Sequence, residues 1–325
     1  MDNATILVII MVFVTFSLTY ELTKIWIKIA KSRNLVGTDM NKIDKKECAE
    51  AGGIAVILAL TFGLFGYVFL KTYLFHSETH FINVLAIINT ILLAGFLGFI
   101  DDVLGWKKGL PQWQKPLLTI PIALPLVVLG ISMQELILPF LGKIEVGLLF
   151  PLFFVPLAIV GASNGFNMLA GLNGLEAGMG AIILGALTLL LAKGTPWLAL
   201  ISGLACASLI CFLMFNWYPA KVFPGNSLTY AVGALIGILA ILSEYTKAAI
   251  LLFLPYFLEL FLKARCKFKG ESFGIPQKDG SLKPPGKICS LTHIFMKFAK
   301  TEKRTVLGIL SFELVLAFLV IILYL

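Results

Sequence analysis

Long apolar runs recur along the whole 325-residue chain, and short polar stretches separate them. A helix needs roughly 20 apolar residues to cross about 30 Å of hydrocarbon, because each residue adds about 1.5 Å of rise. The pattern therefore predicts about ten membrane-spanning helices rather than a water-soluble core. The predicted spans cover residues 4–29, 52–72, 81–100, 116–133, 147–162, 177–192, 197–214, 228–243, 246–264 and 305–325.

The composition supports this fold class. Hydrophobic residues make up 59% of the chain and charged residues 14%, whereas soluble domains carry about 25% charged residues. No hydrophilic stretch is long enough for a second folded domain. Only Asp2, and no basic segment, precedes the first apolar run, so this run is predicted to be a retained span rather than a cleaved signal peptide. We expect one all-α polytopic membrane domain over residues 1–325.

Basic residues divide unevenly between the two faces of this arrangement. The connections that follow odd-numbered spans, with their flanks, carry 22 of the 26 Lys and Arg residues. Cytoplasmic loops are enriched in Lys and Arg, so these connections are predicted to be cytoplasmic and both termini to lie on the other side. The net charge of +8 then favours either attraction to anionic lipid or a cytoplasmic site for an anionic substrate. The predicted cytoplasmic loops are residues 30–51, 101–115, 161–176, 215–227 and 265–304.

The five cysteines show no spacing typical of a metal site, and their number is odd. Two of them lie inside an apolar run. We expect all five to be reduced and structural rather than redox-active. They are Cys48, Cys206, Cys211, Cys266 and Cys289.

An acidic pair, Asp101 and Asp102, ends the third predicted span in the stretch LLAGFLGFIDDVLGW. Neighbouring residues on a helix point about 100° apart, so one carboxylate can bind a cation or a proton while the other orients it. Mg²⁺ favours such oxygens together with substrate phosphates. The alternative is a solvated pair at the end of a helix with no chemical role.

A second polar cluster lies in GASNGFNMLAGLNGLEAGMG, residues 161–180. Asn164 and Asn167 are three residues apart and share a helix face, and Asn173 follows among closely spaced glycines. Asparagine offers a carbonyl ligand and an amide donor, and glycine lets the backbone approach a ligand. Interhelical hydrogen bonding and small-residue packing remain the alternative explanation.

Two further stretches of the predicted cytoplasmic face are polar. FNWYPAKVFPGNSLTY, residues 215–230, places Lys221 and Asn226 in what is either a binding segment or a rigid turn, and the basic loop 265–304 contains His293. A transporter would keep polar groups near the middle of its spans, where this chain has few apart from Glu259 and Glu313. The clusters together predict a site at the membrane surface for one soluble anionic and one lipid substrate.

At FIDDVLGW, NMLAGLNGLEAG, NWYPAKVFPGN and AEAGG the sequence resembles the polyprenyl-phosphate N-acetylhexosamine-1-phosphate transferase superfamily, glycosyltransferase family 4. It is most similar there to the archaeal and eukaryotic UDP-GlcNAc:dolichyl-phosphate GlcNAc-1-phosphotransferases. The resemblance implies transfer of GlcNAc-1-phosphate from UDP-GlcNAc to a polyprenyl (dolichyl) phosphate, with release of UMP. It also implies a lipid bilayer setting (the cell membrane of an archaeon or the endoplasmic reticulum of a eukaryote), a homodimer, and no nucleic-acid partner.

The resemblance also assigns roles to residues. Mg²⁺ is the implied cofactor, with Mn²⁺ as an alternative, and the acidic pair is implied to face the lipid phosphate and the metal-bound pyrophosphate. The implied catalytic residues are Asp101, Asp102 and Lys115, the implied metal ligands are Asn167 and Asn226, and the implied substrate-binding residues are Glu50, Asn164, Gly171, Asn173, Lys221 and His293.

The chain departs from the family pattern at two places. Asn226 stands where the family usually has an aspartate metal ligand, so we expect weaker Mg²⁺ affinity. The last cytoplasmic loop reads ESFGIP where the eukaryotic branch has an Arg-His-Arg cluster, and Lys267, Lys269 or His293 are the candidates to replace it. A related transferase for another UDP-HexNAc, or a catalytically weak binder or transporter of lipid or nucleotide sugar, remains the alternative.

Overall fold

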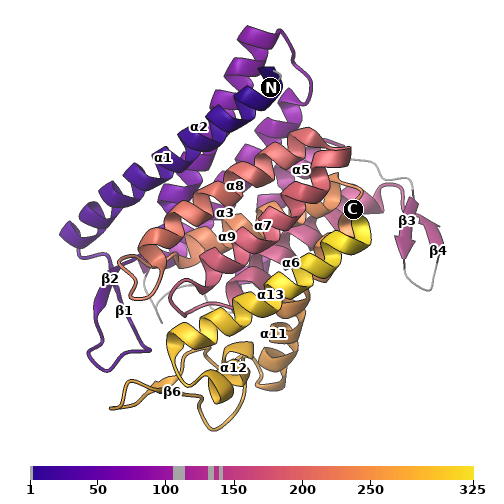
Figure 1. Cartoon of the computed structure of the whole chain (residues 1–325). Coiled ribbons are helices and arrows are strands. Elements are labelled where there is room, and N and C mark those ends of the chain that lie inside the picture. Colours follow the sequence, from indigo (N-terminus) through magenta and orange to yellow (C-terminus); the bar gives the residue numbers. More distant parts are fainter. Residues whose placement is uncertain (1–2, 105–113, 131–134, 139–141) are drawn as a thin grey trace.

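The computed structural model describes residues 3–104, 114–130, 135–138 and 142–325, and these form a bundle of helices with small two-stranded antiparallel sheets (Figure 1). The helices are α1 (Asn3–Ser32), α2 (Gly53–Phe75), α3 (Phe81–Leu104), α4 (Gln114–Thr119), η1 (Ile120–Ala123), α5 (Leu124–Val128), η2 (Phe150–Phe154), α6 (Val155–Met168), α7 (Leu175–Gly194), α8 (Pro196–Asn216), α9 (Gly225–Leu242), α10 (Thr246–Leu252), α11 (Leu254–Arg265), α12 (Leu291–Ala299) and α13 (Glu302–Tyr324). The paired strands are β1 (Val36–Thr38) with β2 (Glu47–Ala49), β3 (Glu135–Leu138) with β4 (Gly142–Glu145), and β5 (Ile275–Pro276) with β6 (Leu282–Lys283).

Eight helical segments of the described chain are long and apolar enough to cross a membrane, so the protein is an integral, multi-pass membrane protein. Each coincides with a predicted span. The other two predicted spans, 116–133 and 246–264, fall on interrupted helices: α4, η1 and α5 in the first, α10 and α11 in the second. Proline explains both interruptions, since it removes a backbone donor and its ring crowds the preceding turn. The prolines are Pro116, Pro121, Pro125 and Pro255.

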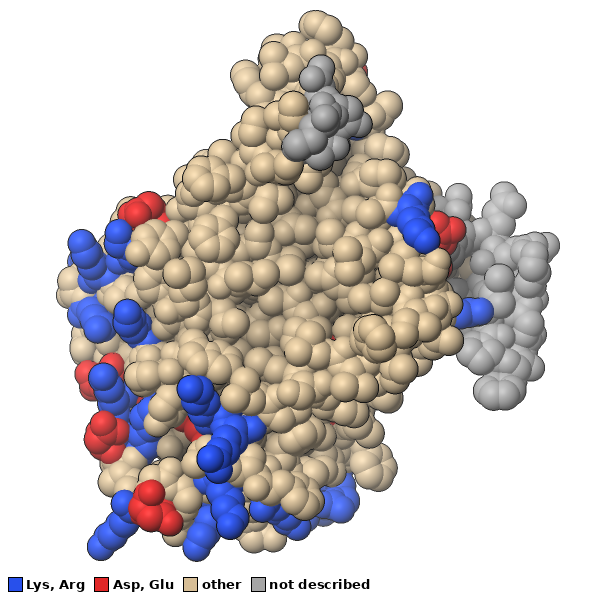
Figure 2. Space-filling model, in the orientation of Figure 1, with Lys and Arg blue, Asp and Glu red and all other residues tan. Residues whose placement is uncertain are grey.

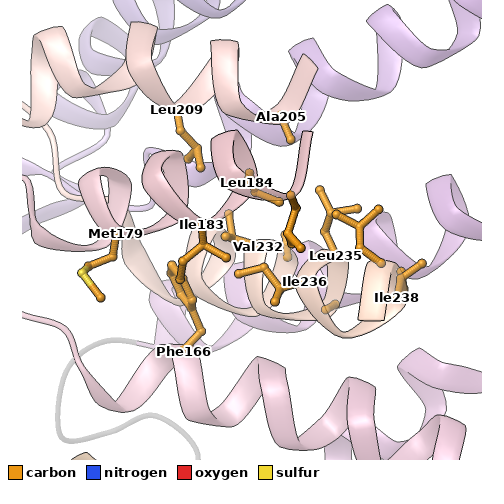
Figure 3. Packing of buried hydrophobic residues seen from close by; sticks show 14 of the residues in the cluster. Phe166, Met179, Ile183, Leu184, Ala205, Leu209, Val232, Leu235, Ile236 and Ile238 are labelled. Atoms are coloured by element: carbon orange, nitrogen blue, oxygen red, sulfur yellow. The ribbon is translucent and has the colours of Figure 1, made fainter. Parts of the chain in front are cut away.

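The core forms around α9, which packs against α3 and α6 and is the most enclosed of the candidate spans. Figure 3 shows its side chains Val232, Leu235 and Ile236 interleaved with residues of neighbouring helices. Small residues allow the close approach: a Cβ on Gly233 would lie 2.5 Å from the carbonyl oxygen of Ala162 in α6. Close backbone contact of this kind is typical of helices packed in lipid, where apolar burial alone drives little association.

Charged side chains gather at one end of the bundle. Figure 2 shows Lys and Arg concentrated over the end that carries β1, β2, α12 and β6, whereas the visible flanks of the long helices are almost uncharged. Figure 1 shows that both chain termini lie away from this end. The polar clusters singled out in the sequence therefore belong to one end of the molecule.

The expectation that every cysteine is reduced is wrong for two of them. Cys266 and Cys289 form a disulfide, with their Cα atoms 5.7 Å apart. The chain between them turns back through the β5–β6 hairpin, which brings together residues 23 positions apart. Spacing alone could not show this. Cys48, Cys206 and Cys211 are free thiols.

Glu259 and Glu313, which the sequence analysis noted as exceptions within the spans, are both fully buried. Glu259 in α11 accepts hydrogen bonds from the Leu291 backbone N–H at 2.6 Å and from the Ser290 hydroxyl at 3.0 Å, so it binds the N-terminus of α12. Glu313 lies inside α13, and neither of its carboxylate oxygens has a hydrogen-bond partner among the described residues.

Candidate active site

The last turn of α3 meets the first turn of α9, and the acidic pair lies at this junction. Asp101 and Asp102 are buried, with 4% and 8% of their surface exposed. The backbone N–H groups of Asn226 and Ser227 donate to the two oxygens of Asp102, at 2.7 and 3.1 Å. The first N–H groups of a helix have no partner within the helix and carry partial positive charge, so a carboxylate is stabilised there. Asp102 therefore binds the N-terminus of α9.

Two glycines make this junction sterically feasible. Gly225 has φ +70°, and a Cβ there would lie 2.3 Å from the Oδ2 atom of Asp102. A Cβ on Gly98 in α3 would lie 2.3 Å from the carbonyl oxygen of Asn226. The glycine of the FPGN motif is thus required both for its left-handed backbone and for space beside a carboxylate.

Two nitrogen donors converge on Asp101. The Nζ atom of Lys115 in α4 lies 2.7 Å from its Oδ2 atom, and the side-chain amide of Asn226 donates to the same oxygen at 2.8 Å. The lysine side chain is 11% exposed and the Asp101 side chain 2%, so the pair is well shielded from water. The predicted catalytic residues Asp101, Asp102 and Lys115 are therefore brought together, with Asn226 between the two acids.

Helix α6 contributes both predicted asparagines to this neighbourhood. The Thr229 hydroxyl of α9 donates to Asn167 Oδ1 at 2.7 Å. The amide of Asn164 donates to the Thr119 hydroxyl of α4 at 2.9 Å and to the Val160 carbonyl of its own helix. Asn167 thus faces the first turn of α9, and Asn164 ties α6 to the short helix that carries the catalytic lysine candidate.

Glu50 lies between β2 and α2, where this segment pairs with the FPGN region. The backbone N–H groups of Gly52 and Gly53 donate to the carbonyls of Phe223 and Pro224, each at 2.8 Å. Burial, and to a smaller extent the charges of Asp102 and Glu176, together raise the pKa of Glu50 to about 8. At neutral pH the carboxyl is therefore mostly protonated and can donate a hydrogen bond.

The loop between α6 and α7 contains the other two predicted substrate-binding positions. Gly171 has φ +106°, its N–H donates to Glu176 Oε1 at 2.8 Å, and its carbonyl accepts from the Asn41 amide at 2.8 Å. The Asn173 side chain donates to both Asp39 and Glu302. Both positions therefore lie in one network that also contains residues the sequence reasoning missed.

The missed residues are acids and an amide in three separate segments: Asp39, Asn41, Glu176 and Glu302. Asp39 and Asn41 follow β1, Glu176 lies in the first turn of α7, and Glu302 begins α13. An acidic residue in the first turn of a helix is an ordinary sequence feature, since it complements the helix dipole. Glu176 lies three residues after Asn173 within NMLAGLNGLEAG, and its place in this motif was a signal that could have identified it. No short motif links Asp39, Asn41 or Glu302 to Asn173, so only the fold reveals these three.

The structure does not bring Lys221 or His293 into the hydrogen-bond network around the acidic pair. The Lys221 side chain is exposed, and its backbone carbonyl accepts from the Ala49 N–H at 3.4 Å. His293 is buried: the Cys289 N–H donates to its Nδ1 atom at 3.2 Å, and its Nε2 atom donates to the Phe273 carbonyl at 3.1 Å. Burial lowers the pKa of His293, so it is neutral at pH 7 with the proton on Nε2.

His293 also borders a hollow of about 410 Å³ together with Lys269, Lys287 and Phe273. This hollow is lined mainly by residues of the basic loop 265–304. Lys269 is one of the candidates to replace the Arg-His-Arg cluster that this loop lacks. Phe273 connects the hollow to the α6–α7 loop, because a Cβ on Gly171 would lie 2.7 Å from the Phe273 ring. Lys269, unlike His293, has an exposed side chain there.

The side-chain oxygens around the acidic pair are of the type that binds a hard divalent cation. Mg²⁺ prefers oxygen ligands, and Asp101, Asn167 and Asn226 supply carboxylate and amide oxygens. Within the described residues no three His, Cys, Asp or Glu side chains are grouped so as to hold a metal ion. A cation here would therefore rely on amide oxygens as well as on the acidic pair.

Comparisons with known proteins show which family the chain belongs to. The family described as Glycosyl transferase family 4 matches residues 84–244, the stretch that carries the acidic pair, both asparagines of α6 and Asn226. A protein of Saccharolobus solfataricus is 38% identical over 97% of this chain and 96% of its own length. A protein of Sulfolobus acidocaldarius is 37% identical over 97% of this chain and 95% of its own length.

Both relatives carry, provisionally, the name UDP-N-acetylglucosamine--dolichyl-phosphate N-acetylglucosaminephosphotransferase. A protein of Dictyostelium discoideum with the same name is 27% identical over 74% of this chain and 67% of its own length. The two archaeal proteins align along almost the whole chain, so the likeness is not limited to the motifs. The chain therefore belongs to glycosyl transferase family 4.

Proposed function

We propose that the protein transfers GlcNAc-1-phosphate from UDP-GlcNAc to a polyprenyl phosphate such as dolichyl phosphate, releasing UMP and forming polyprenyl-diphosphate-GlcNAc. The names of the relatives support this activity. The observation that carries it is the convergence of Asp101, Lys115 and Asn226 from α3, α4 and α9 at one polar end of a membrane protein. A site of this kind can receive a lipid phosphate from the bilayer and a nucleotide sugar from water.

The chemical problem is to bring two anions together. A non-bridging oxygen of the lipid phosphate attacks the β-phosphorus of UDP-GlcNAc, the bond from that phosphorus to the bridging oxygen breaks, and UMP leaves with the electron pair. A phosphate monoester has a second pKa near 6, so most of the acceptor is already a dianion at pH 7 and needs little help from a base. Positioning and neutralisation of charge then account for most of the catalysis.

The chain divides these tasks between its residues. Lys115 supplies the positive charge for a phosphate, and Asp101 holds that ammonium in place through the 2.7 Å ion pair. Asp102 accepts two backbone N–H groups and fixes the start of α9, which sets the position of Asn226. We assign orientation of the lipid phosphate to Asp101 and Lys115, and the framework of the site to Asp102.

Mg²⁺ is part of the proposal, with Mn²⁺ as the alternative ion. When bound, such a cation neutralises the negative charge that builds up on the diphosphate. Asp101, Asn167 and Asn226 are the residues that would hold it. Glu50, Gly171 and Asn173 would bind the nucleotide sugar from the adjoining loops.

The proposed topology has ten crossings, with the interrupted segments α4–α5 and α10–α11 completing the eight long helices. Both termini then lie on the non-cytoplasmic side and the site on the cytoplasmic face. The basic end of Figure 2 supports this orientation, because cytoplasmic surfaces carry the excess of Lys and Arg. The lipid tail would lie along the spans beside α3 and α4.

Release of UMP by the purified protein in lipid nanodiscs tests the proposal. Wild-type protein should release UMP from UDP-GlcNAc only when a polyprenyl phosphate is present, and EDTA should abolish the release. Asp101→Asn, which keeps the size of the side chain, should reduce the rate strongly. Nucleotide-sugar flux across vesicles without UMP release would favour a transporter, and UMP release from a different UDP-HexNAc alone would favour the sister activity.

A further inference from the structure

The chain between α11 and α12 forms a loop that a disulfide closes at its base. Cys266 follows the last residue of α11, and Cys289 lies just before α12. Both cysteines are buried, with 7% and 6% of their surface exposed. Figure 1 shows this part of the chain at the end of the bundle that carries β6 and α12. We name residues 266–289 the disulfide loop.

The first turn of the disulfide loop is held between the disulfide and a buried lysine. A Cβ on Gly270 would lie 2.3 Å from the Cβ atom of Cys289, so the backbone of Gly270 packs directly on the disulfide. On the other side, the Nζ atom of Lys263 in α11 donates to the Gly270 carbonyl and to the Ser272 hydroxyl, each at 2.8 Å. The position of residues 270–272 therefore depends on both anchors.

The residues that follow touch the α6–α7 loop at Gly171. The Phe273 ring would lie 2.7 Å from a Cβ on Gly171, so ring and backbone are in close contact. The Gly274 N–H donates to Asn41 Oδ1 at 3.0 Å, and the amide of the same asparagine donates to the Gly171 carbonyl at 2.8 Å. Two separate contacts thus connect the disulfide loop to Gly171, only a few residues after the glycine that packs on the disulfide.

A small thiol can reach the disulfide from the hollow of about 410 Å³, because Cys289 forms part of its wall. Lys269 and Lys287 also line this hollow. Disulfide exchange begins with attack by a thiolate, and neighbouring cations stabilise thiolates. Reduction by a dithiol breaks the S–S bond and passes two electrons and two protons to the two sulfurs, while the reductant closes into its own disulfide.

Resting on the proposed function, in which Gly171 binds the nucleotide sugar, we propose that Cys266 and Cys289 are positioning residues whose disulfide holds the disulfide loop against the α6–α7 loop, so that its reduction by a dithiol weakens the binding of UDP-GlcNAc. A loop released at its base gains conformational freedom, which must be given up again when substrate binds. The contacts of Asp101 with Lys115 and Asn226 come from α4 and α9, so the transfer step itself should change little.

Steady-state kinetics of one preparation in two redox states test the proposal. The protein in nanodiscs is assayed for UMP release after oxidation, after treatment with dithiothreitol and after reoxidation. On reduction the KM for UDP-GlcNAc should rise on the order of fivefold and kcat should change by less than about twofold, and reoxidation should restore both. Thiol titration of the denatured protein should find three free cysteines before reduction and all five after it.

Three variants separate positioning from a merely structural role. Cys266→Ala/Cys289→Ala should have the KM of reduced wild type and no response to dithiothreitol. Cys206→Ala, which removes a free thiol of α8 and leaves the disulfide intact, is the matched control and should keep the full response. Phe273→Ala removes the ring that contacts Gly171, so it should raise KM and also shrink the response to dithiothreitol.

An unchanged KM after complete reduction of wild type overturns the proposal, as does a response that persists in the double cysteine variant. Five titratable thiols in the oxidised protein overturn it as well, because the disulfide would then not form. If the double variant does not fold, the reversible comparison within wild type still decides. Absence of turnover in both redox states of wild type is a different result, and it refutes the proposed function.

Discussion

The acidic pair at the α3–α9 junction and the cluster formed by Asp39, Lys42, Asn173 and Glu302 are both polar clusters at the same end of the bundle, yet they are built differently. Around the acidic pair the partners come from short motifs: FIDD supplies the carboxylates, and FPGN with the serine that follows it supplies the N–H groups and Gly225. Around Asn173 the partners are isolated acids 129 and 134 residues away. The first cluster is readable from the sequence, whereas the second exists only in the fold.

The difference also separates chemistry from recognition. The junction contains the lysine that can neutralise a phosphate, so substitutions there should alter the rate of transfer. The Asn173 cluster contains an ion pair and an oriented amide, so substitutions there should alter the binding of the nucleotide sugar more than the transfer step. The two clusters can therefore be told apart by whether a substitution changes the turnover rate or the binding of substrate.

The largest effect is expected from Lys115→Met. It removes the ammonium that lies 2.7 Å from Asp101 and that neutralises phosphate in the proposed reaction. We expect the turnover rate to fall on the order of 100- to 1000-fold, the range found when one electrostatic contact to the transition state is removed. Steady-state UMP release measures this, with Lys28→Met, an exposed lysine of α1, as the control. Equal small losses in both variants would remove Lys115 from the catalytic group.

A smaller loss is expected from Gly225→Ala. The new Cβ would lie 2.3 Å from Asp102 Oδ2 and would force a side chain onto a φ of +70°, so the bond between Asp102 and the start of α9 is disrupted. We expect a stability loss of about 1–3 kcal/mol and roughly tenfold slower turnover. Gly161→Ala is the matched control, because nothing lies within 4 Å of its Cβ position. Thermal unfolding and turnover of the two variants should separate clearly, and identical behaviour would contradict the steric account of the junction.

The third prediction concerns Asn226→Asp. Wild-type Asn226 donates to Asp101 at 2.8 Å, whereas an aspartate would place a third carboxylate beside the acidic pair. Without a divalent cation these charges repel, so the variant should be less stable than wild type in EDTA. Mg²⁺ should then raise its unfolding temperature more than that of wild type, with half-saturation at about tenfold lower concentration. A Mg²⁺ response equal to that of wild type would show that position 226 does not face the ion.

The last prediction is a pH dependence of stability at Glu50, which leaves the transfer chemistry aside. Its pKa in the folded protein is about 8, above the ordinary value of 4.5, because burial and nearby carboxylates disfavour its charged form. Between these values the folded state keeps a proton that the unfolded state has lost, so stability falls as pH rises through this window. Glu50→Gln removes that loss. The unfolding temperature of Glu50→Gln relative to wild type should therefore rise from pH 5 to pH 8.5, whereas Glu47→Gln, an exposed neighbour in β2, should show no such trend.

Much of the fold follows from apolar run length alone. Every one of the eight long candidate spans coincides with a predicted span, because a continuous apolar run leaves a helix as the only way to satisfy the backbone in lipid. The two predicted spans that are interrupted helices in the structure contain Pro121, Pro125 and Pro255. Each proline leaves a backbone carbonyl of the preceding turn without its hydrogen-bond donor, and whether the helix breaks there depends on how the neighbouring helices pack.

The site was predictable only where its partners are local. Asp101, Asp102 and Asn226 were identified from motifs, and the structure joins them by direct hydrogen bonds. Asp39 and Glu302 could not be found, since an acid in a turn or at the start of a helix has an ordinary local explanation. The Cys266–Cys289 disulfide was missed for a related reason: the hairpin between the two residues, rather than their spacing, brings them together.

The most direct test of the central claim follows the β-phosphorus of the nucleotide sugar. The protein in nanodiscs is given UDP-GlcNAc labelled with ³²P in the β-phosphate together with a polyprenyl phosphate and Mg²⁺, and the lipid and aqueous fractions are separated. The account predicts that label enters the lipid fraction with wild type, that an equal amount of unlabelled UMP appears in water, and that Asp101→Asn transfers little. Lipid that gains the sugar without the label, or label that stays in the aqueous fraction while UMP is released, would contradict it.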